Sequence, residues 1–173
     1  MTVSPSVITP SLRLATATDV LLYFEWANDP DVRKMSFDGN SIPIDAHRVW
    51  FTRKLESPDV LMLVLEAPTP VGQIRFDVAN DVALIGFSLA GHARGRGLGS
   101  YLLRQGCQHL HARFPDVRTA RGLVKAANIA SRRAFEAAGF HVAAETRESG
   151  VPALIYDIDL ARFTAATPST ASS

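Results

Sequence analysis

The chain has 173 residues, enough for one domain with a core of ordinary size. Hydrophobic residues make up 47% of the sequence and charged residues 20%, a balance that excludes a disordered polymer. The formal net charge of +1 excludes a strong field that would attract nucleic acid or an anionic membrane. No apolar stretch approaches the roughly 18 residues of a membrane span, and the N-terminus lacks a signal-like apolar run. We therefore expect a cytoplasmic protein without a nucleic-acid or membrane partner.

The first third of the sequence predicts one strand and two helices. Polar and apolar residues alternate over 11–15, as in a short strand. A helix is expected to follow, capped by a threonine and ending at the Asn-Asp-Pro sequence of residues 28–30. A second helix begins near Pro43, and its apolar residues recur at helical spacing as far as Leu55.

The middle of the sequence changes to the period of strands. Residues 60–65 form a continuous apolar run, and alternating segments follow at 71–78 and 82–89. These three strands are predicted to form an antiparallel meander. The rest of the chain predicts a helix after a Gly-rich turn and then, in order, strand 119–124, helix 129–138 and strands 140–146 and 153–160. Elements in this order imply an α/β fold with a mixed sheet and helices on its faces.

The two ends differ in composition from the rest of the chain. Residues 1–10 and 164–173 are rich in Ser, Thr, Pro and Ala and are predicted to be flexible. Residues 11–163 are expected to form a single domain.

The one cysteine, Cys107, excludes an internal disulfide and any multi-cysteine metal site. Leu103 and Leu110 lie at helical spacing from it, which favours a core position over a nucleophile. No metal site is expected.

Glycines are concentrated between the last strand of the meander and the helix that follows it. Four of the 11 fall within nine residues, namely Gly91, Gly95, Gly97 and Gly99. Glycine lets backbone N–H groups approach an anion closely, and a helix start adds a partial positive charge. The Gly-x-Gly-x-Gly spacing differs from the dinucleotide and nucleoside-triphosphate motifs. The segment predicts a cradle for a phosphate-like anion, with a plain Gly-rich turn as the alternative.

Two motifs, a Gly-rich loop and a helix downstream of it, resemble those of the Gcn5-related N-acetyltransferase (GNAT) superfamily, as does the strand before the loop. Arg94-Gly95-Arg96-Gly97-Leu98-Gly99 is similar to its pyrophosphate loop, and Ile85-Gly86-Phe87-Ser88-Leu89 looks like its bulged fourth strand. Roughly thirty residues downstream, the segment from Asn128 to Phe140 is similar to its second signature, an Asn-x-x-Ser helix ending in Gly-Phe. The resemblance spans roughly residues 12–160. It implies a mixed, mostly antiparallel sheet of about seven strands with helices on both faces, and an N-acetyltransferase whose co-substrate is acetyl-CoA.

The resemblance also assigns cofactor roles. The backbone of residues 87–89 would pair with the pantetheine arm of acetyl-CoA at a splay in the sheet. The amides of residues 94–100 would hold the pyrophosphate, supplemented by the charges of Arg94 and Arg96. Asn128 would contact the pantetheine, cap its helix, or do both. The implied cofactor-binding set is Phe87, Ser88, Leu89, Arg94, Gly95, Arg96, Gly97, Leu98, Gly99, Ser100, Asn128, Ser131 and Phe135.

Two positions depart from the pattern of the family. Many members carry a glutamate as general base where Leu84 stands, and a tyrosine as general acid where Phe135 stands. Positioning, and polarisation of the thioester by backbone amides, can supply much of the rate without them. Asp77 and Tyr156 are the candidate catalytic residues that remain.

The N-terminal half is expected to recognise the acceptor amine. The stretches 26–33 and 42–51 resemble a bacterial branch of the family that includes amino-sugar-nucleotide and ribosomal-protein N-terminal acetyltransferases. Arginine forks and tryptophan faces suit a nucleotide, although core packing explains both tryptophans equally well. The candidate substrate-binding residues are Trp26, Arg33, His47, Trp50 and Arg75.

The resemblance leaves several functions open. The preferred acceptor is a small-molecule amine such as a nucleotide-linked amino sugar, and the alternative is the N-terminal amine of a peptide or ribosomal protein. A module that senses acetyl-CoA without turnover is the alternative from another class, favoured by the missing glutamate and tyrosine. The chain is expected to be a monomer or a homodimer.

Overall fold

The computed structural model describes residues 9–164, so most of the two predicted flexible ends lies outside the described residues. The strands are β1 (Ser11–Leu14), β2 (Val60–Glu66), β3 (Pro70–Ala79), β4 (Val82–Leu89), β5 (Thr119–Lys125), β6 (His141–Glu148) and β7 (Val151–Asp159). The helices are α1 (Val20–Asn28), α2 (Pro30–Met35), α3 (Ile44–Glu56), α4 (Leu98–Arg113) and α5 (Ile129–Ala137), with short 3-10 helices η1 (Ala17–Asp19), η2 (Gly91–Ala93) and η3 (Leu160–Phe163). Within this described part of the chain, no helix has the length and apolar character needed to cross a membrane.

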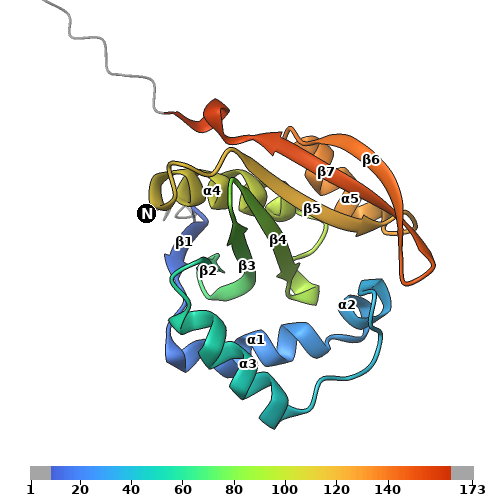
Figure 1. The fold of residues 1–173 in the computed structure, drawn as a ribbon. Helices are drawn as coiled ribbons and strands as arrows, with labels where there is room; N and C mark the ends of the chain where they lie inside the picture. Colours follow the sequence, from blue (N-terminus) through green and yellow to red (C-terminus); the bar gives the residue numbers. More distant parts are fainter. Residues whose placement is uncertain (1–8, 165–173) are drawn as a thin grey trace, which may run out of the picture.

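All seven strands join one sheet in the order β1-β2-β3-β4-β5-β7-β6. Every neighbouring pair is antiparallel except β4 and β5, which run parallel. Figure 1 shows α1 and α3 together on one side, away from α4 and α5. The predicted fold, a mixed and mostly antiparallel sheet with helices on both faces, is confirmed.

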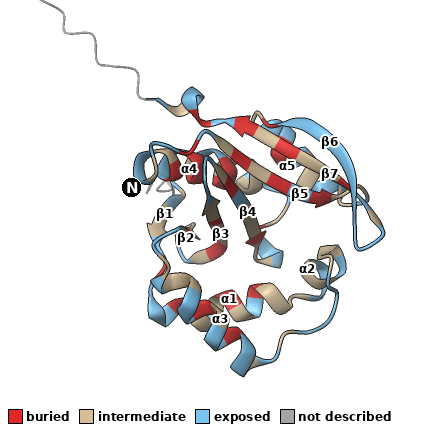
Figure 2. Ribbon diagram, in the orientation of Figure 1, coloured by how far each residue is buried: buried red, intermediate tan, exposed pale blue. Residues whose placement is uncertain are grey.

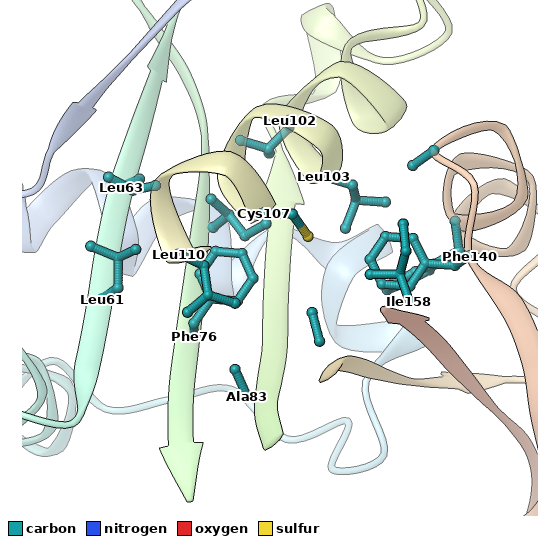
Figure 3. Close-up of a cluster of buried hydrophobic side chains, with 14 of the residues drawn as sticks. Leu61, Leu63, Phe76, Ala83, Leu102, Leu103, Cys107, Leu110, Phe140 and Ile158 are labelled. Carbon is teal, nitrogen blue, oxygen red and sulfur yellow. The ribbon is translucent and has the colours of Figure 1, made fainter. Parts of the chain in front are cut away.

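The main core lies between α4 and the sheet. Leu102, Leu103, Cys107 and Leu110 of α4 are fully buried in this core. Figure 3 shows Leu110 beside Phe76 of β3, and Leu103 on the side of Phe140 and Ile158. Burial raises the pKa of the Cys107 thiol to about 12, which keeps the thiol protonated. The predicted core position of this cysteine is therefore confirmed.

A second, smaller core lies on the opposite face of the sheet. Tyr23 and Trp26 of α1 and Phe51 of α3 pack there against Met62 and Val64 of β2. The β2 strand is thus buried on both faces, as its continuous apolar run predicts. By contrast, every residue of β6 is exposed (Figure 2). The β6 strand therefore contributes no buried residue to either core.

One helix was not expected from the sequence. The Asn-Asp-Pro stretch ends α1, but Pro30 is also the first residue of α2. The Asp29 side chain caps α2 by accepting hydrogen bonds from the backbone N–H groups of Asp31 and Val32. An aspartate cap followed by proline at the first helical position is a start signal as much as a stop signal, so the same residues that end α1 also begin α2.

The two parallel strands separate before they end. Pairing between β4 and β5 stops at Ile85 and Gly122, although β4 continues to Leu89 and β5 to Lys125. Figure 1 shows the two strands diverging from this point towards α2. From Gly86 onward, β4 is paired only with β3. The sheet therefore opens between β4 and β5, next to the start of the Gly-rich segment. We call this opening the splay.

Candidate active site

The Gly-rich segment forms an open cradle in front of α4. Gly95 and Gly97 have φ angles of 74° and 75°, a region that side chains disfavour, and a Cβ at either position would meet no atom within 4 Å. Among residues 9–164, no side chain caps α4, and the Tyr101 N–H donates to the Gly97 carbonyl as the helix begins. The amides of residues 98–100 are therefore free to bind an anion, and the space beside the glycines fits a pyrophosphate.

The two arginines of this segment have different surroundings. Arg94 turns back from the cradle: its Nε and Nη2 donate to the Leu89 carbonyl at 3.2 and 3.0 Å, and its guanidinium pairs with Asp29 and Asp31. Burial alone would raise the pKa of Asp29, but the hydrogen bond and charge of Arg94, together with the backbone hydrogen bonds from Val32 and Asp31, lower that pKa. Arg94 thus joins the end of β4 to the start of α2, and its charge is already paired. Arg96 is exposed and has no partner among the described residues.

Phe87 and Phe135 line the splay on the side of α5. Their rings pack edge to face with centroids 5.6 Å apart. Phe135 also lies on the last paired residue of β5, since a Cβ at Gly122 would be 2.3 Å from its Cζ. Ser88, on the other face of β4, accepts a hydrogen bond from Gln73 Nε2 at 3.1 Å. Residues 87–89 therefore have no strand partner on the side of β5, although the Leu89 carbonyl accepts hydrogen bonds from Arg94, and a pantetheine contact at this edge stays a prediction.

Asn128 and Ser131 form the N-terminal cap of α5. Asn128 Oδ1 accepts a hydrogen bond from the Ser131 backbone N–H, and Asn128 Nδ2 donates to Ser131 Oγ, both at 3.1 Å. The cap is thus present, and a pantetheine contact by the same residues stays a prediction.

Tyr156, a candidate acid, lies inside the core. It is 0% exposed, its hydroxyl donates to Glu136 at 2.8 Å, and its ring stacks on Phe135. Burial, together with the hydrogen bond to Glu136, raises the pKa of the hydroxyl. A buried hydroxyl engaged by a carboxylate is poorly placed to protonate a leaving thiolate, so this geometry argues for a structural role.

Asp77, the candidate base, is held by two cations. Lys54 Nζ donates to its Oδ1 at 2.5 Å and Arg75 Nε donates to its Oδ2 at 2.7 Å. Burial favours a higher pKa for this carboxyl, but the two cations outweigh it and lower the pKa. A carboxylate with a lowered pKa and two bound cations is a weak proton acceptor. The geometry makes Asp77 a residue that positions Arg75.

Leu84 stands between two charged groups on the face opposite α4. It pairs with Asp77 of β3 on one side and with Arg121 of β5 on the other, so the three side chains share this face. Arg121 forms a bidentate ion pair with Asp157, in which Nε donates to Oδ1 at 2.8 Å and Nη2 donates to Oδ2 at 2.7 Å. Leu84 itself is 50% exposed. Because no other element within residues 9–164 covers Leu84, this face of the sheet is open to solvent where β4 and β5 begin to separate. We call this surface the open face.

Three predicted substrate-binding residues make mainly internal contacts. Trp26 is 7% exposed and His47 is 2% exposed, both in the packing of α1 and α3. His47 Nε2 bonds to the Val20 carbonyl, and burial lowers its pKa, which keeps the ring neutral. Arg33 donates to the carbonyls of Ala27, Asp38 and Asn40 and so holds the loop after α2. These internal contacts argue for structural roles, and a substrate contact by any of the three stays a prediction.

The other two predicted substrate-binding residues, Trp50 and Arg75, lie together on the open face. The Arg75 guanidinium carbon is 5.1 Å from the centroid of the Trp50 ring. Sequence reasoning missed two residues that complete this group, Lys54 and Gly86. An isolated glycine inside a strand is a recognised sign of close approach and would have drawn attention to Gly86. Within residues 9–164, no three His, Cys, Asp or Glu residues gather as metal ligands would.

Comparisons with known proteins agree with this geometry. A family model described as an acetyltransferase (GNAT) domain matches residues 11–141. No curated protein sequence matches the chain. Among solved structures, spermidine N-acetyltransferase from Vibrio cholerae, in complex with CoA and spermine, is 12% identical with a TM-score of 0.78, covering 89% of this chain and 97% of its own.

Two further solved structures share the fold. The aminoglycoside acetyltransferase AAC(6')-Ib, in complex with ribostamycin and coenzyme A, is 20% identical with a TM-score of 0.77, covering 95% of this chain and 99% of its own. An N-acetyltransferase from Staphylococcus aureus is also 20% identical, with a TM-score of 0.75, covering 88% and 99%. Because the family model spans most of the chain, this protein belongs to the GNAT family and is an acyl-CoA-dependent N-acetyltransferase with acetyl-CoA as its co-substrate.

Proposed function

We propose that the enzyme acetylates a weakly basic primary amine, with a nucleotide-linked amino sugar as the preferred acceptor and the N-terminal α-amine of a protein as the second candidate. The observation that carries this proposal is the row Asp77–Leu84–Arg121 at the root of the splay. It holds a leucine where many relatives have a base, and both of its charged members are already ion-paired.

The basicity of the acceptor follows from this lack of a base. A lysine side chain, with a pKa of about 10.4, is almost wholly protonated at pH 7 and cannot attack until a base removes its proton. An α-amine, at about 7.7–8.0, already has a useful neutral fraction. The electron-withdrawing oxygens of a sugar likewise lower the basicity of its amine. A site without a free carboxylate therefore suits such acceptors, whose proton can leave to water.

The chain's own residues would act mainly by positioning. Bound acetyl-CoA supplies the acetyl group and a thiolate that leaves when the new C–N bond replaces the C–S bond. The cradle at residues 95–100 would hold the pyrophosphate, and the free edge of β4 at residues 87–89 would direct the pantetheine arm into the splay. Backbone amides of that edge would polarise the thioester carbonyl. Leu84 would leave room for the amine to approach from the open face.

The test is thiol release from acetyl-CoA with a panel of amines, measured from pH 6 to pH 10. The panel contains a nucleotide-linked amino sugar, a dipeptide with a free N-terminus, Nα-acetyl-lysine and spermidine. We expect kcat/KM to rise with pH as each acceptor amine loses its proton. The amino sugar and the dipeptide, whose amines are less basic, are therefore preferred near pH 7. Efficient acetylation of lysine and spermidine, with the other two inert, would contradict the proposal. Tight acetyl-CoA binding without thiol release for any amine would favour the sensor alternative.

A further inference from the structure

Arg75 on β3 is held in one orientation by three neighbours on the open face. Its Nε donates to Asp77 at 2.7 Å, its guanidinium lies over the Trp50 ring at 5.1 Å, and Lys54 holds the second oxygen of Asp77. A guanidinium that is stacked and hydrogen-bonded through Nε has already lost its rotamer freedom. A ligand that binds it therefore does so without the cost of ordering a long side chain.

The two terminal nitrogens of Arg75 are free and point over β4. Among the described residues, neither Nη1 nor Nη2 has a hydrogen-bond partner, whereas Nε is engaged. A Cβ built at Gly86 would be 3.1 Å from Nη2 and 3.5 Å from Nη1. The missing side chain at Gly86 is thus what lets the guanidinium lie against the strand. Gly86 is also the first residue of β4 beyond the pairing with β5, directly before the strand edge proposed for the pantetheine arm.

The charges around Arg75 favour an anion. Lys54 and Arg75 share the single carboxylate of Asp77, so this group carries surplus positive charge. Arg121, across Leu84, is matched by Asp157 and does not offset that surplus. A polycationic acceptor would be repelled here. A carboxylate or phosphate would instead accept two parallel hydrogen bonds from Nη1 and Nη2.

We propose that Arg75 determines acceptor specificity by binding an oxyanion group of the acceptor, so that the preferred substrates are primary amines that also carry a carboxylate or a phosphate. The proposal rests on the function proposed above and narrows its substrate class. Arg75 fixes the anionic end of the acceptor, and the amine then lies over Leu84 at the root of the splay. The two sources of the oxyanion, an amino acid or a phosphorylated amino sugar, share this chemistry.

The test compares matched acceptors that differ only in the oxyanion. Glucosamine 1-phosphate is compared with glucosamine, and an amino acid with its amide, with kcat/KM corrected for the neutral fraction of each amine. We expect the wild type to prefer at least one anionic member by about tenfold or more, as loss of a charge-assisted hydrogen bond implies. Which pair shows the preference distinguishes phosphate from carboxylate.

Substitution of Arg75 assigns the preference to its guanidinium. Arg75→Gln should raise KM for the anionic acceptor about 10- to 100-fold and change the neutral acceptor by less than about threefold, because only the anion is bound by the fork. Arg75→Lys, which keeps the charge without the fork, should give an intermediate KM. Arg53→Gln, which removes an exposed arginine of α3, is the charge-matched control and should change neither acceptor. Calorimetric affinity for acetyl-CoA should be unchanged in all three variants.

Two results would overturn this inference while leaving the acetyltransferase intact. One is equal kcat/KM for the members of both pairs in the wild type, and the other is an equal loss for both members in Arg75→Gln. Binding of glucosamine 1-phosphate and of the amino acid to the complex with CoA gives a readout that needs no turnover. If no amine releases thiol, the proposed function fails, and the specificity role of Arg75 still stands or falls on whether Arg75→Gln weakens that binding.

Discussion

Arg94 and Arg96 are two residues apart in one loop, but within the described part of the chain the charge of Arg94 is paired and that of Arg96 is not. The guanidinium of Arg94 is bound to Leu89, Asp29 and Asp31, whereas Arg96 is exposed at the cradle. We predict that Arg96→Ala weakens acetyl-CoA binding about tenfold, because a charge beside the pyrophosphate is lost. Arg94→Ala should instead lower the urea midpoint and change the affinity less. Calorimetry and urea unfolding of both variants check this, and the reverse ranking would assign the pyrophosphate contact to Arg94.

His47 links the packing of α1 and α3 to pH. Burial lowers its pKa, so the folded state holds the neutral ring and the unfolded state, with a pKa of about 6.5, takes up the proton first. Its contribution to stability is therefore complete above pH 6.5 and is lost as the pH falls from 6.5 towards the lower pKa of the folded state. We predict that the urea midpoint of the wild type drops between pH 7.5 and pH 5.5. His47→Gln should be less stable at pH 7.5 and should show a smaller drop. A larger acceptor KM in this variant, with an unaltered pH dependence of stability, would restore His47 as a substrate ligand.

At the scale of elements, β4 places a leucine where a base would act. Leu84 is half exposed, so a carboxylate there would stay solvated, and Arg121 beside it would keep the carboxylate ionised. We predict that Leu84→Glu raises kcat/KM at pH 7 for Nα-acetyl-lysine more than for an amino sugar, because only the strongly basic amine needs a base. Leu123→Glu, on the same face of β5 and 40% exposed, is the matched control and should give no gain. An equal change in kcat/KM for both acceptors, or a gain in Leu123→Glu, would contradict the claim that the native site lacks a general base.

The elements also differ in how far the sequence predicts them. The strands and long helices follow from hydrophobic period, as the double burial of β2 and the buried face of α4 illustrate. The divergence of β4 and β5 was anticipated only through the resemblance, because strand pairing depends on contacts between residues distant in sequence. Side-chain roles were least predictable. Arg94 stands in a phosphate-binding motif, but its guanidinium pairs with Asp29 and Asp31 at the start of α2. The sequence does not predict this contact, because residues 28–30 were expected only to end α1.

At the scale of the molecule, the two faces of the sheet are covered differently. Its α4 face holds the main core and carries the cradle at the start of that helix. Its other face is covered by α1 and α3 over β2 but leaves Leu84 and Leu123 uncovered near the splay. The splay connects the two faces, so acetyl-CoA bound at the cradle, as we propose, would present its thioester to an acceptor on the other face. In this proposal the exposed leucines would form the floor of the acceptor site.

The central claim, that acetyl-CoA binds in the cradle and splay, is tested most directly by calorimetric titration of acetyl-CoA into Gly97→Asp and Gly150→Asp. Both glycines have positive φ, at 75° and 78°, and a Cβ at either would meet nothing within 4 Å, so the backbone strain is matched. Only Gly97 stands in the cradle, while Gly150 lies in the turn between β6 and β7. We predict wild-type affinity for Gly150→Asp and loss of binding for Gly97→Asp, because its carboxylate occupies the pyrophosphate position. Wild-type affinity in a folded Gly97→Asp protein would contradict the account.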